Sequence, residues 1–193
     1  MKRRVAILAS GGGSNAEALI AAMQAPEHPA TPVLVFTNRP GAGVLARAQA
    51  RGIPTALVDH RAFGSRQEFD QAVLKVLQAA GPDLLCLAGY LRILTPAFVE
   101  AYRGRILNIH PSLLPKFGGP GMHGERVHAA VLAAGEAESG ASVHWVVDGV
   151  DQGPLVLQER VPVLPGDDAH SLAQRVLEAE HRLYPRALQL VCS

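Results

Sequence analysis

The sequence predicts a single-domain α/β fold, a doubly wound and mostly parallel β-sheet flanked by helices, with an antiparallel extension in the C-terminal half. Through the first hundred residues, apolar runs of strand length alternate with helical stretches. These runs are apolar throughout, as in parallel strands buried on both faces. In the second half, two extended runs flank an Asp- and Gly-rich connector, so they either pair as antiparallel strands or lie as neighbours.

Composition limits the class of protein. A chain of 193 residues with 48% hydrophobic content can bury one good core. The formal net charge of +1 gives no electrostatic basis for binding nucleic acid or an anionic membrane. No segment approaches the roughly 20 apolar residues of a membrane span. Two cysteines are too few to form a disulfide framework. We therefore expect Cys86 to be a packed core thiol, and the protein to reside in the reducing cytoplasm.

The first strand is expected over residues 5–9, an apolar run that leads into three consecutive glycines. An alanine-rich stretch over 16–24 follows and predicts a helix, which gives a strand, a tight turn and a helix in succession. A second strand is expected over 32–37. The helix predicted over 44–51 ends at Gly52, as is typical of a helix C-terminus, and a weaker strand near 55–58 comes next.

A longer helix is predicted over residues 65–80, with Ser65 as its N-cap and the Gly81-Pro82 pair as its end. Residues 84–88 form a fully apolar run and predict a buried strand. A second helix start is indicated at Thr95-Pro96. Within the helix predicted over 65–80, the apolar residues recur at helical spacing, at Phe69, Val73, Val76 and Leu77.

In the second half, a strand over residues 106–110 is followed by a loop over 116–124, which holds four glycines and one proline without apolar periodicity. A helix over 125–134 and extended runs over 141–147 and 154–163 come next. Residues 168–191 predict a long amphipathic helix, in which Pro185 is expected to cause a kink.

The glycine turn is compatible with three kinds of site. Gly11-x-Gly13 followed by Ala16 matches a dinucleotide-binding pattern, and Arg39 would then contact the extra phosphate of NADP. The turn also offers backbone N–H groups at a helix N-terminus, where Ser14 and Asn15 add donors suited to a phosphate monoester. The third interpretation is a tight turn without any ligand.

The run over residues 106–115, Ile-Leu-Asn-Ile-His-Pro-Ser-Leu-Leu-Pro, carries the clearest chemistry. Side chains two apart on a strand share a face, so Asn108 and His110 lie side by side at its end. An amide that donates to a carbonyl oxygen, beside an imidazole that titrates near neutral pH, is equipment for acyl transfer. Asp151 is expected to raise the pKa of His110, and a similar role for Asp148 stays open.

Other chemistries are less compatible with the sequence. The histidines lack metal-ligand spacing on any predicted helix, so no metal is expected. No nucleophile elbow is present, and Ser112 is interpreted as a turn residue. Residues 88–94 are open to two interpretations, because Gly89 permits close approach of a flat heterocycle, but the segment equally fits a loop packed on the core.

The Asn-x-His-Pro-Ser-Leu-Leu-Pro run resembles that of the folate-dependent formyltransferases, and the resemblance extends over residues 5–191. The chain is most similar to members that formylate glycinamide ribonucleotide in de novo purine biosynthesis, with 10-formyltetrahydrofolate as co-substrate. The resemblance implies a Rossmann-like, phosphate-binding half over residues 1–104 and a catalytic, folate-binding half over 105–193. It implies small-molecule partners only, without nucleic acid or membrane, in a monomer or homodimer.

The resemblance also implies roles for individual residues. The catalytic residues would be Asn108, His110 and Asp151, with Asp151 keeping the imidazole protonated. Glycinamide ribonucleotide would be bound by Gly13, Ser14, Asn15 and Glu180, and the folate by Arg66, Leu91, Arg92, Ile93, Leu94 and Asn108.

The Gly-rich stretch over residues 117–124 departs from the form typical of the family, so no role is assigned to it or to His123 and His128. Family members that act on initiator tRNA or hydrolyse the folate carry an additional domain, for which this chain has no room.

Overall fold

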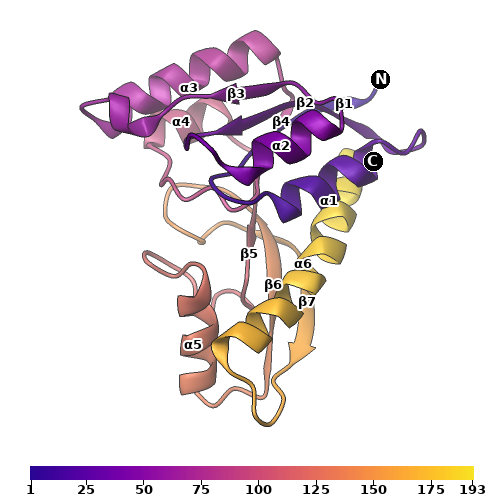
Figure 1. The fold of residues 1–193 in the computed structure, drawn as a ribbon, viewed down its shortest axis with the longest axis vertical. Coiled ribbons are helices and arrows are strands. Elements are labelled where there is room, and N and C mark those ends of the chain that lie inside the picture. Colours follow the sequence, from indigo (N-terminus) through magenta and orange to yellow (C-terminus); the bar gives the residue numbers. More distant parts are fainter.

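A computed structural model describes all residues from 1 to 193 and contains one seven-stranded sheet. The strand order is β3-β2-β1-β4-β5-β6-β7, in which the first five strands are parallel and the last two antiparallel. The predicted fold class is therefore confirmed (Figure 1). The strands are β1 (Arg3–Leu8), β2 (Ala30–Thr37), β3 (Thr55–Leu57), β4 (Leu84–Leu87), β5 (Ile106–His110), β6 (Glu138–Trp145) and β7 (Leu155–Pro162). The α-helices are α1 (Ser14–Met23), α2 (Gly43–Ala50), α3 (Arg66–Ala80), α4 (Pro96–Ala101), α5 (Glu125–Ala133) and α6 (Ala169–Cys192).

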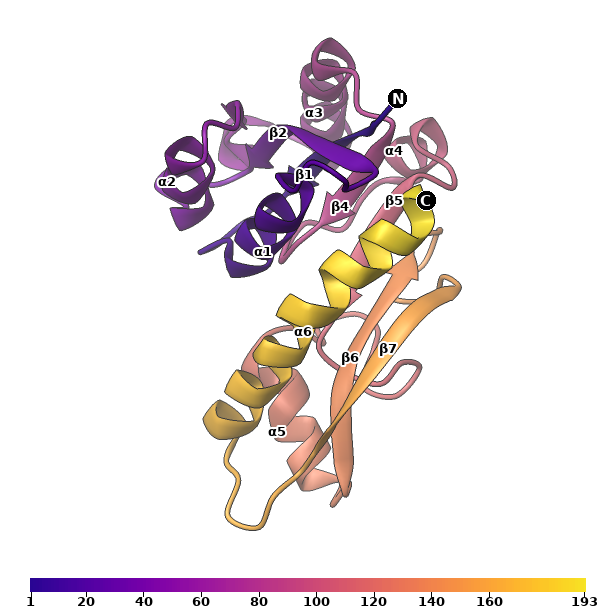
Figure 2. The ribbon, with the colours of Figure 1, turned by 90° about the vertical axis from the view of Figure 1, so that its right-hand side faces the viewer.

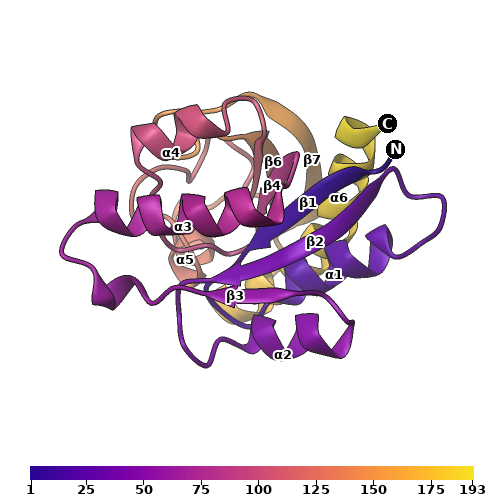
Figure 3. The same cartoon turned by 90° about the horizontal axis from the view of Figure 1, so that it is seen from above.

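The inner strand β1 is buried on both faces and separates two layers of the core. Val5 and Ile7 belong to the larger cluster, which includes residues of α1, α2, α5 and α6. Ala6 and Leu8 point the other way, into a smaller cluster beneath α3 and α4. This alternation follows from the two-residue period of a strand. Figure 3 shows α3 and α4 on one face of the sheet and α1 on the other.

Helix ends follow the predicted signals. The Ser65 hydroxyl accepts the backbone N–H of Glu68 at 3.1 Å, and Gly81 closes α3 in the left-handed conformation. The longest helix, α6, begins at a capping box built on Asp168 and packs against α1, α5, β6 and β7 (Figure 2). It continues past Pro185 as far as Cys192.

The antiparallel extension is a hairpin whose strands begin slightly differently from the predicted runs. Strand β6 begins at Glu138 rather than at residue 141, because residues 138–140 pair with residues 160–162 of β7. Strand β6 also pairs with β5 in a register that places His144 opposite Asn108 and Ser142 opposite His110. The pairing thus places a second histidine beside the Asn108-x-His110 motif.

The apolar strand over β4 includes Cys86, which is fully buried, and burial raises the pKa of its thiol to about 12. The interpretation of Cys86 as a core thiol is confirmed by this burial. None of the helices combines the length and the apolar character that crossing a lipid bilayer requires. The proposed division of the chain at residues 104 and 105 stays a prediction.

Candidate functional site

Three loops meet at the carboxyl ends of the parallel strands β1, β4 and β5. In open α/β sheets, ligands bind at the carboxyl ends of the strands. The binding site lies where the chain leaves two neighbouring strands toward opposite faces of the sheet. The loop after β1 contacts the loop after β4 directly. The backbone N–H of Ser10 donates to the carbonyl of Gly89 at 3.0 Å, and the N–H of Leu91 donates to the Ser10 hydroxyl at 2.9 Å. The glycine turn and the segment over 88–94 therefore form one continuous rim.

The glycine turn opens α1 in a conformation that a side chain would disturb. Gly13 has φ +80° and precedes the first residue of the helix, Ser14. A Cβ at Gly13 would lie 2.6 Å from Cβ of Val44, so both the backbone angle and the packing require glycine here. The backbone N–H groups of the first turn are left available to an anion.

Next to this turn, Glu180 of α6 meets Asn15 of α1. The Glu180 side chain is almost fully buried, and this burial raises the pKa of its carboxyl group to about 7, against a smaller opposing contribution from a hydrogen bond with Asn15. The Oδ1 atom of Asn15 is buried without a partner. The structure thus brings together two of the residues predicted to bind glycinamide ribonucleotide, one with an unpaired acceptor.

The loop after β4 presents apolar side chains to solvent. Leu91 and Ile93 are each 49% exposed, so the interpretation of a loop merely packed on the core does not describe these two residues. The guanidinium of Arg92 lies 5.6 Å from the ring centre of Phe69, one turn into α3 from Arg66. Apart from Asn108 on β5, the predicted folate residues therefore lie on the loop after β4 and the first turn of α3.

Asp70 holds this loop in place. Its Oδ2 atom accepts both the backbone N–H of Thr95, at 2.8 Å, and the Thr95 hydroxyl, at 2.7 Å. Thr95 in turn caps α4 by accepting the N–H of Phe98. A buried carboxylate thus fixes the end of the loop at which Leu94 lies.

Asn108, His110 and Asp151 converge, although Asp151 lies far from the other two along the chain. The Nδ1 atom of His110 lies 3.4 Å from Oδ2 of Asp151, and the two side chains are 5% and 8% exposed. Asp151 has a left-handed backbone conformation, with φ 57°. Asn108 is joined to the same group through a fourth residue, His144.

His144 is not among the residues predicted for the site, so the sequence reasoning missed its position. Its Nε2 atom lies 3.1 Å from Nδ2 of Asn108 and 3.5 Å from Oδ1 of Asp151, while its Nδ1 lies 3.0 Å from the Trp145 carbonyl oxygen. The sequence did offer one indication of His144, because it lies in a run expected to form a strand in the second half of the chain. The exact partner required the antiparallel register.

The Gly-rich loop after β5 also reaches the site through backbone atoms. The Nε2 atom of His110 lies 2.9 Å from the carbonyl oxygen of Phe117, and the N–H of Gly119 donates to Oδ2 of Asp151 at 3.0 Å. Phe117 has a positive φ of 56°, which is uncommon for a residue with a side chain. Backbone atoms of residues 117–119 therefore contact both partners of the His110–Asp151 pair.

The pKa of His110 reflects two opposing effects. Burial lowers the pKa of the imidazole, and the opposing effects of Asp151 and the Phe117 carbonyl do not fully offset it. Asp151 thus raises the pKa of His110 as expected, but desolvation outweighs this effect, so the net direction is downward in the ligand-free site. The pKa of Asp151 is lowered, since His144, His110 and the Gly119 N–H together overcome the effect of burial.

The remaining sequence expectations concern nearby polar residues. Asp148 is exposed, whereas Asp151 faces the histidines. His123 is exposed, and His128 is buried with its pKa lowered by that burial. The hydroxyl of Ser112 donates to the Lys116 carbonyl at 2.6 Å, as expected of a turn residue.

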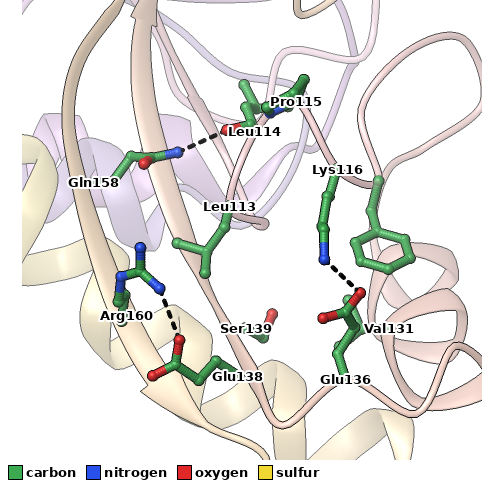
Figure 4. A pocket seen from close by; sticks show the side chains of 11 residues that line it. Leu113, Leu114, Pro115, Lys116, Val131, Glu136, Glu138, Ser139, Gln158 and Arg160 are labelled. Atoms are coloured by element: carbon green, nitrogen blue, oxygen red, sulfur yellow. Dashed lines mark hydrogen bonds and ion pairs between the residues drawn. The ribbon is translucent and has the colours of Figure 1, made fainter.

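Two cavities lie beside this site. One, of about 580 Å³, has Asp151 in its wall between the loops over residues 114–119 and 150–155. The other, of about 280 Å³, lies beneath the loop at Leu113 and contains none of the predicted site residues. Figure 4 shows that its charges are paired on opposite sides, Lys116 with Glu136 and Arg160 with Glu138. It therefore presents no unpaired charge to a ligand.

Comparison with known proteins gives consistent matches over the whole chain. A family model described as Formyl transferase matches residues 3–188. The trifunctional purine biosynthetic protein adenosine-3 of Gallus gallus is 49% identical over 192 residues, which cover 100% of this chain but 19% of that protein. The chain spans less than a fifth of the length of this relative and of its counterpart in Homo sapiens.

Relatives of similar length match equally well. The phosphoribosylglycinamide formyltransferase of Escherichia coli (strain K12) is 44% identical over 181 residues, covering 94% of this chain and 83% of that protein. The crystal structure of phosphoribosylglycinamide formyltransferase from Brucella melitensis superposes with a TM-score of 0.93 at 50% identity, and the match covers 100% of this chain and 97% of that one.

Proposed function

Because this chain belongs to the formyl transferase family, we propose that it transfers the formyl group of 10-formyltetrahydrofolate to the primary amine of glycinamide ribonucleotide, a step of de novo purine biosynthesis. The observation that carries the proposal is the convergence of Asn108, His110 and Asp151 at the end of β5. A hydrogen-bond donor and an ionisable imidazole lie together where the oxygen of a carbonyl group becomes negative during acyl transfer.

In the proposed mechanism the amine nitrogen of the acceptor attacks the formyl carbon directly. The carbonyl oxygen gains negative charge in the tetrahedral intermediate, and the amide N–H of Asn108 and the imidazolium of His110 donate to it. The bond between the formyl carbon and N10 of the folate then breaks. The amine loses one proton and N10 gains one, so the reaction needs no covalent enzyme intermediate.

His110 changes partner in this mechanism. In the ligand-free structure its Nε2 donates to the Phe117 carbonyl, at 2.9 Å. We propose that the formyl oxygen replaces this carbonyl in the substrate complex, while Asp151 stays next to Nδ1 and stabilises the charged ring. Because the oxyanion forms only during the reaction, this stabilisation favours the transition state over the bound substrate.

Two binding regions follow from the same proposal. Gly13, Ser14 and Asn15 offer the N-terminus of α1 to the phosphate of the ribonucleotide, and Glu180 accepts hydrogen bonds from its glycinamide part. The exposed side chains of Leu91 and Ile93 contact the flat ring of the folate.

The remaining folate contacts are proposed at charged residues on the same rim. Arg66 is exposed at the first position of α3 and faces solvent, which suits the carboxylates of a folate tail. Arg92, Leu94 and Asn108 complete the proposed folate site. We propose small-molecule substrates only, and the choice between monomer and homodimer stays a prediction.

The experiment that tests the proposal measures formyl transfer by the purified chain with three acceptors. Glycinamide ribonucleotide, an initiator tRNA charged with methionine, and water are compared, with the change in folate absorbance as the readout. Transfer to glycinamide ribonucleotide that exceeds the other two by at least 100-fold supports the proposal. Equal rates with all three acceptors, or tight binding of NADPH in place of a folate analogue, would contradict it.

A further inference from the structure

We propose that Asn38 is a positioning residue for folate binding, whose side chain acts through the Ser10 hydroxyl to hold the backbone of Leu91. The inference rests on the proposed formyl transfer, in which Leu91 belongs to the folate site. Asn38 directly follows β2 and is 1% exposed, so it lies too deep to contact a substrate itself. Any effect of Asn38 on the folate must therefore pass through its neighbours.

Asn38 belongs to a row of contacts that crosses the carboxyl ends of four neighbouring strands, in the order β3-β2-β1-β4 (Figure 3). The residues that lie after these strands are, in the same order, His60, Asn38, Ser10 and Leu91. Nδ1 of His60 lies 3.1 Å from Nδ2 of Asn38. The hydroxyl of Ser10 donates to Oδ1 of Asn38 at 2.6 Å and accepts the N–H of Leu91 at 2.9 Å. Each strand end is thus linked to the next.

The Ser10 hydroxyl needs Asn38 in order to keep its contact with the loop after β4. A hydroxyl has one hydrogen to donate and lone pairs that accept. Because the oxygen accepts the N–H of Leu91, its own hydrogen is directed to Asn38. Ser10 is 2% exposed, so removal of Asn38 would leave a buried donor without its acceptor. We expect the hydroxyl then to rotate toward another acceptor, which takes its lone pairs away from Leu91.

The N–H of Leu91 is one of only two anchors of the exposed part of this loop. Over residues 91–95, the backbone N–H groups bonded within the protein are those of Leu91 and Thr95, and each donates to a side chain, of Ser10 and of Asp70 respectively. The side chains of Leu91 and Ile93 project into solvent between these anchors. Loss of the Ser10 contact would therefore free the end of the loop that carries Leu91.

A second connection from Asn38 to the loop passes through aromatic rings. The ring of His60 packs edge-on against that of Phe69, with centres 6.2 Å apart, and the Arg92 guanidinium lies 5.6 Å from the centre of the Phe69 ring. This route depends on ring contacts, whereas the route through Ser10 consists of two short hydrogen bonds. We therefore expect Ser10 to transmit most of the effect of Asn38.

The environment of Asn38 also bears on the dinucleotide pattern of the glycine turn. In dinucleotide-binding folds, an acidic residue at the end of the second strand binds the hydroxyl groups of the ribose. Here an amide lies at the end of β2, and both of its polar atoms face partners within the protein. The end of β2 therefore supports the loop after β4 and is closed to a ribose.

The test measures folate affinity in N38A and S10A, which remove the two partners of the same hydrogen bond. For each variant we expect the dissociation constant of a folate analogue without a formyl group, measured by titration calorimetry, to rise about 5- to 15-fold, the equivalent of one hydrogen bond. The KM for 10-formyltetrahydrofolate should rise in parallel, whereas kcat and the KM for glycinamide ribonucleotide should stay within about threefold of the parent.

T37V is the matched control. Thr37 is fully buried beside Asn38, but its hydroxyl oxygen accepts only the N–H of Arg39 and makes no contact with Ser10. We expect T37V to keep the dissociation constant of the analogue within about twofold of the parent, since surface-loop anchors are untouched. Thermal unfolding of all variants establishes that they fold. If N38A does not fold, S10A alone decides, because it removes the same anchor of Leu91.

A double-mutant cycle identifies the route from Asn38 to the loop. In a parent that carries S10A, N38A should raise the dissociation constant by less than about twofold, because the hydroxyl through which Asn38 acts is absent. The inference is overturned if S10A leaves folate affinity unchanged, if N38A keeps its full effect beside S10A, or if T37V causes an equal loss. Failure of the unmodified chain to bind the folate analogue would instead contradict the proposed function.

Discussion

The hydroxyl of Tyr184 lies 3.2 Å from the carbonyl oxygen of Leu107, the residue immediately before Asn108. The same hydroxyl lies 3.0 Å from the carbonyl of Leu87 at the end of β4. Tyr184 is fully buried on α6, one turn beyond Glu180. Its hydroxyl therefore links α6, which carries Glu180, to the ends of β4 and β5.

We expect Y184F to lower the free energy of unfolding by about 1 to 2 kcal/mol, because it removes the donor to two buried carbonyl oxygens. Urea unfolding monitored by circular dichroism measures this change. Y102F is the matched control, since Tyr102 is also buried but its hydroxyl makes no hydrogen bond within the protein. A loss in Y102F as large as that in Y184F would contradict the role given to the Tyr184 hydroxyl.

D151N should lower kcat about 10²- to 10³-fold, because the neutral amide no longer stabilises a charged His110. Asp148 lies on the same connector but is exposed, so D148N supplies a control with the same change of charge and is expected to keep kcat within about twofold. Steady-state formyl transfer measures both variants. Similar losses in the two would mean that the net charge of the connector matters rather than the contact with His110.

Glu180 should make the stability depend on pH. Its pKa is about 7 in the folded chain, against an ordinary value of 4.5 for the unfolded chain, so at intermediate pH the folded form holds a proton that the unfolded form has released. Stability from this group is therefore full below pH 4.5 and is lost as the pH rises to about 7, a change of about 3 kcal/mol. The difference in unfolding free energy between the parent and E180Q, measured by urea at pH 5 and pH 8, should show this loss. An unchanged difference would contradict the buried, protonated carboxyl group.

His110 contributes to the pH dependence with the opposite sign. Burial lowers the pKa of the folded imidazole, so the unfolded chain binds the proton more readily. Stability from this residue is present above about pH 6.5 and falls as the pH decreases through that value. Relative to H110Q, the parent should lose stability between pH 7.5 and pH 5.5 in urea unfolding. A parent that gains stability over this range would show that Asp151 outweighs burial.

G13A should weaken binding of the acceptor. The substitution strains a backbone at φ +80° and places Cβ against Val44, so the first turn of α1 must move. We expect the KM for glycinamide ribonucleotide to rise at least tenfold. Gly41 has a similar φ of +74° but open space around a Cβ, so G41A separates backbone strain from displacement of the turn. Equal KM values for the two variants would argue against a phosphate site at Gly13.

Much of the fold follows from local patterns. The apolar strands and the caps at Ser65 and Gly81 are encoded by neighbouring residues, and they lie where the sequence predicts them. The proximity of Asn108 and His110 could also be predicted from the sequence, because two-residue spacing on a strand puts both side chains on one face. These features need only short-range information.

The rest of the site depends on long-range geometry. His144 reaches Asn108 only through the register of β5 and β6, which no local pattern specifies. Phe117 and Gly119 act through backbone atoms of an irregular loop, so their side chains carry no signal. The net pKa direction of His110 depends on how completely the fold buries the ring, and this burial, which opposes the effect of Asp151, cannot be predicted from the sequence.

In the proposed mechanism, Asn108 and His110 stabilise the oxyanion that forms when the formyl group is transferred. Its most direct test is the single-turnover rate of formyl transfer to glycinamide ribonucleotide by N108A and H110A, measured together with the dissociation constants of both substrates. We expect rates lower by at least 100-fold in each variant, with dissociation constants within about threefold of the parent. A rate in either variant close to that of the parent would contradict it.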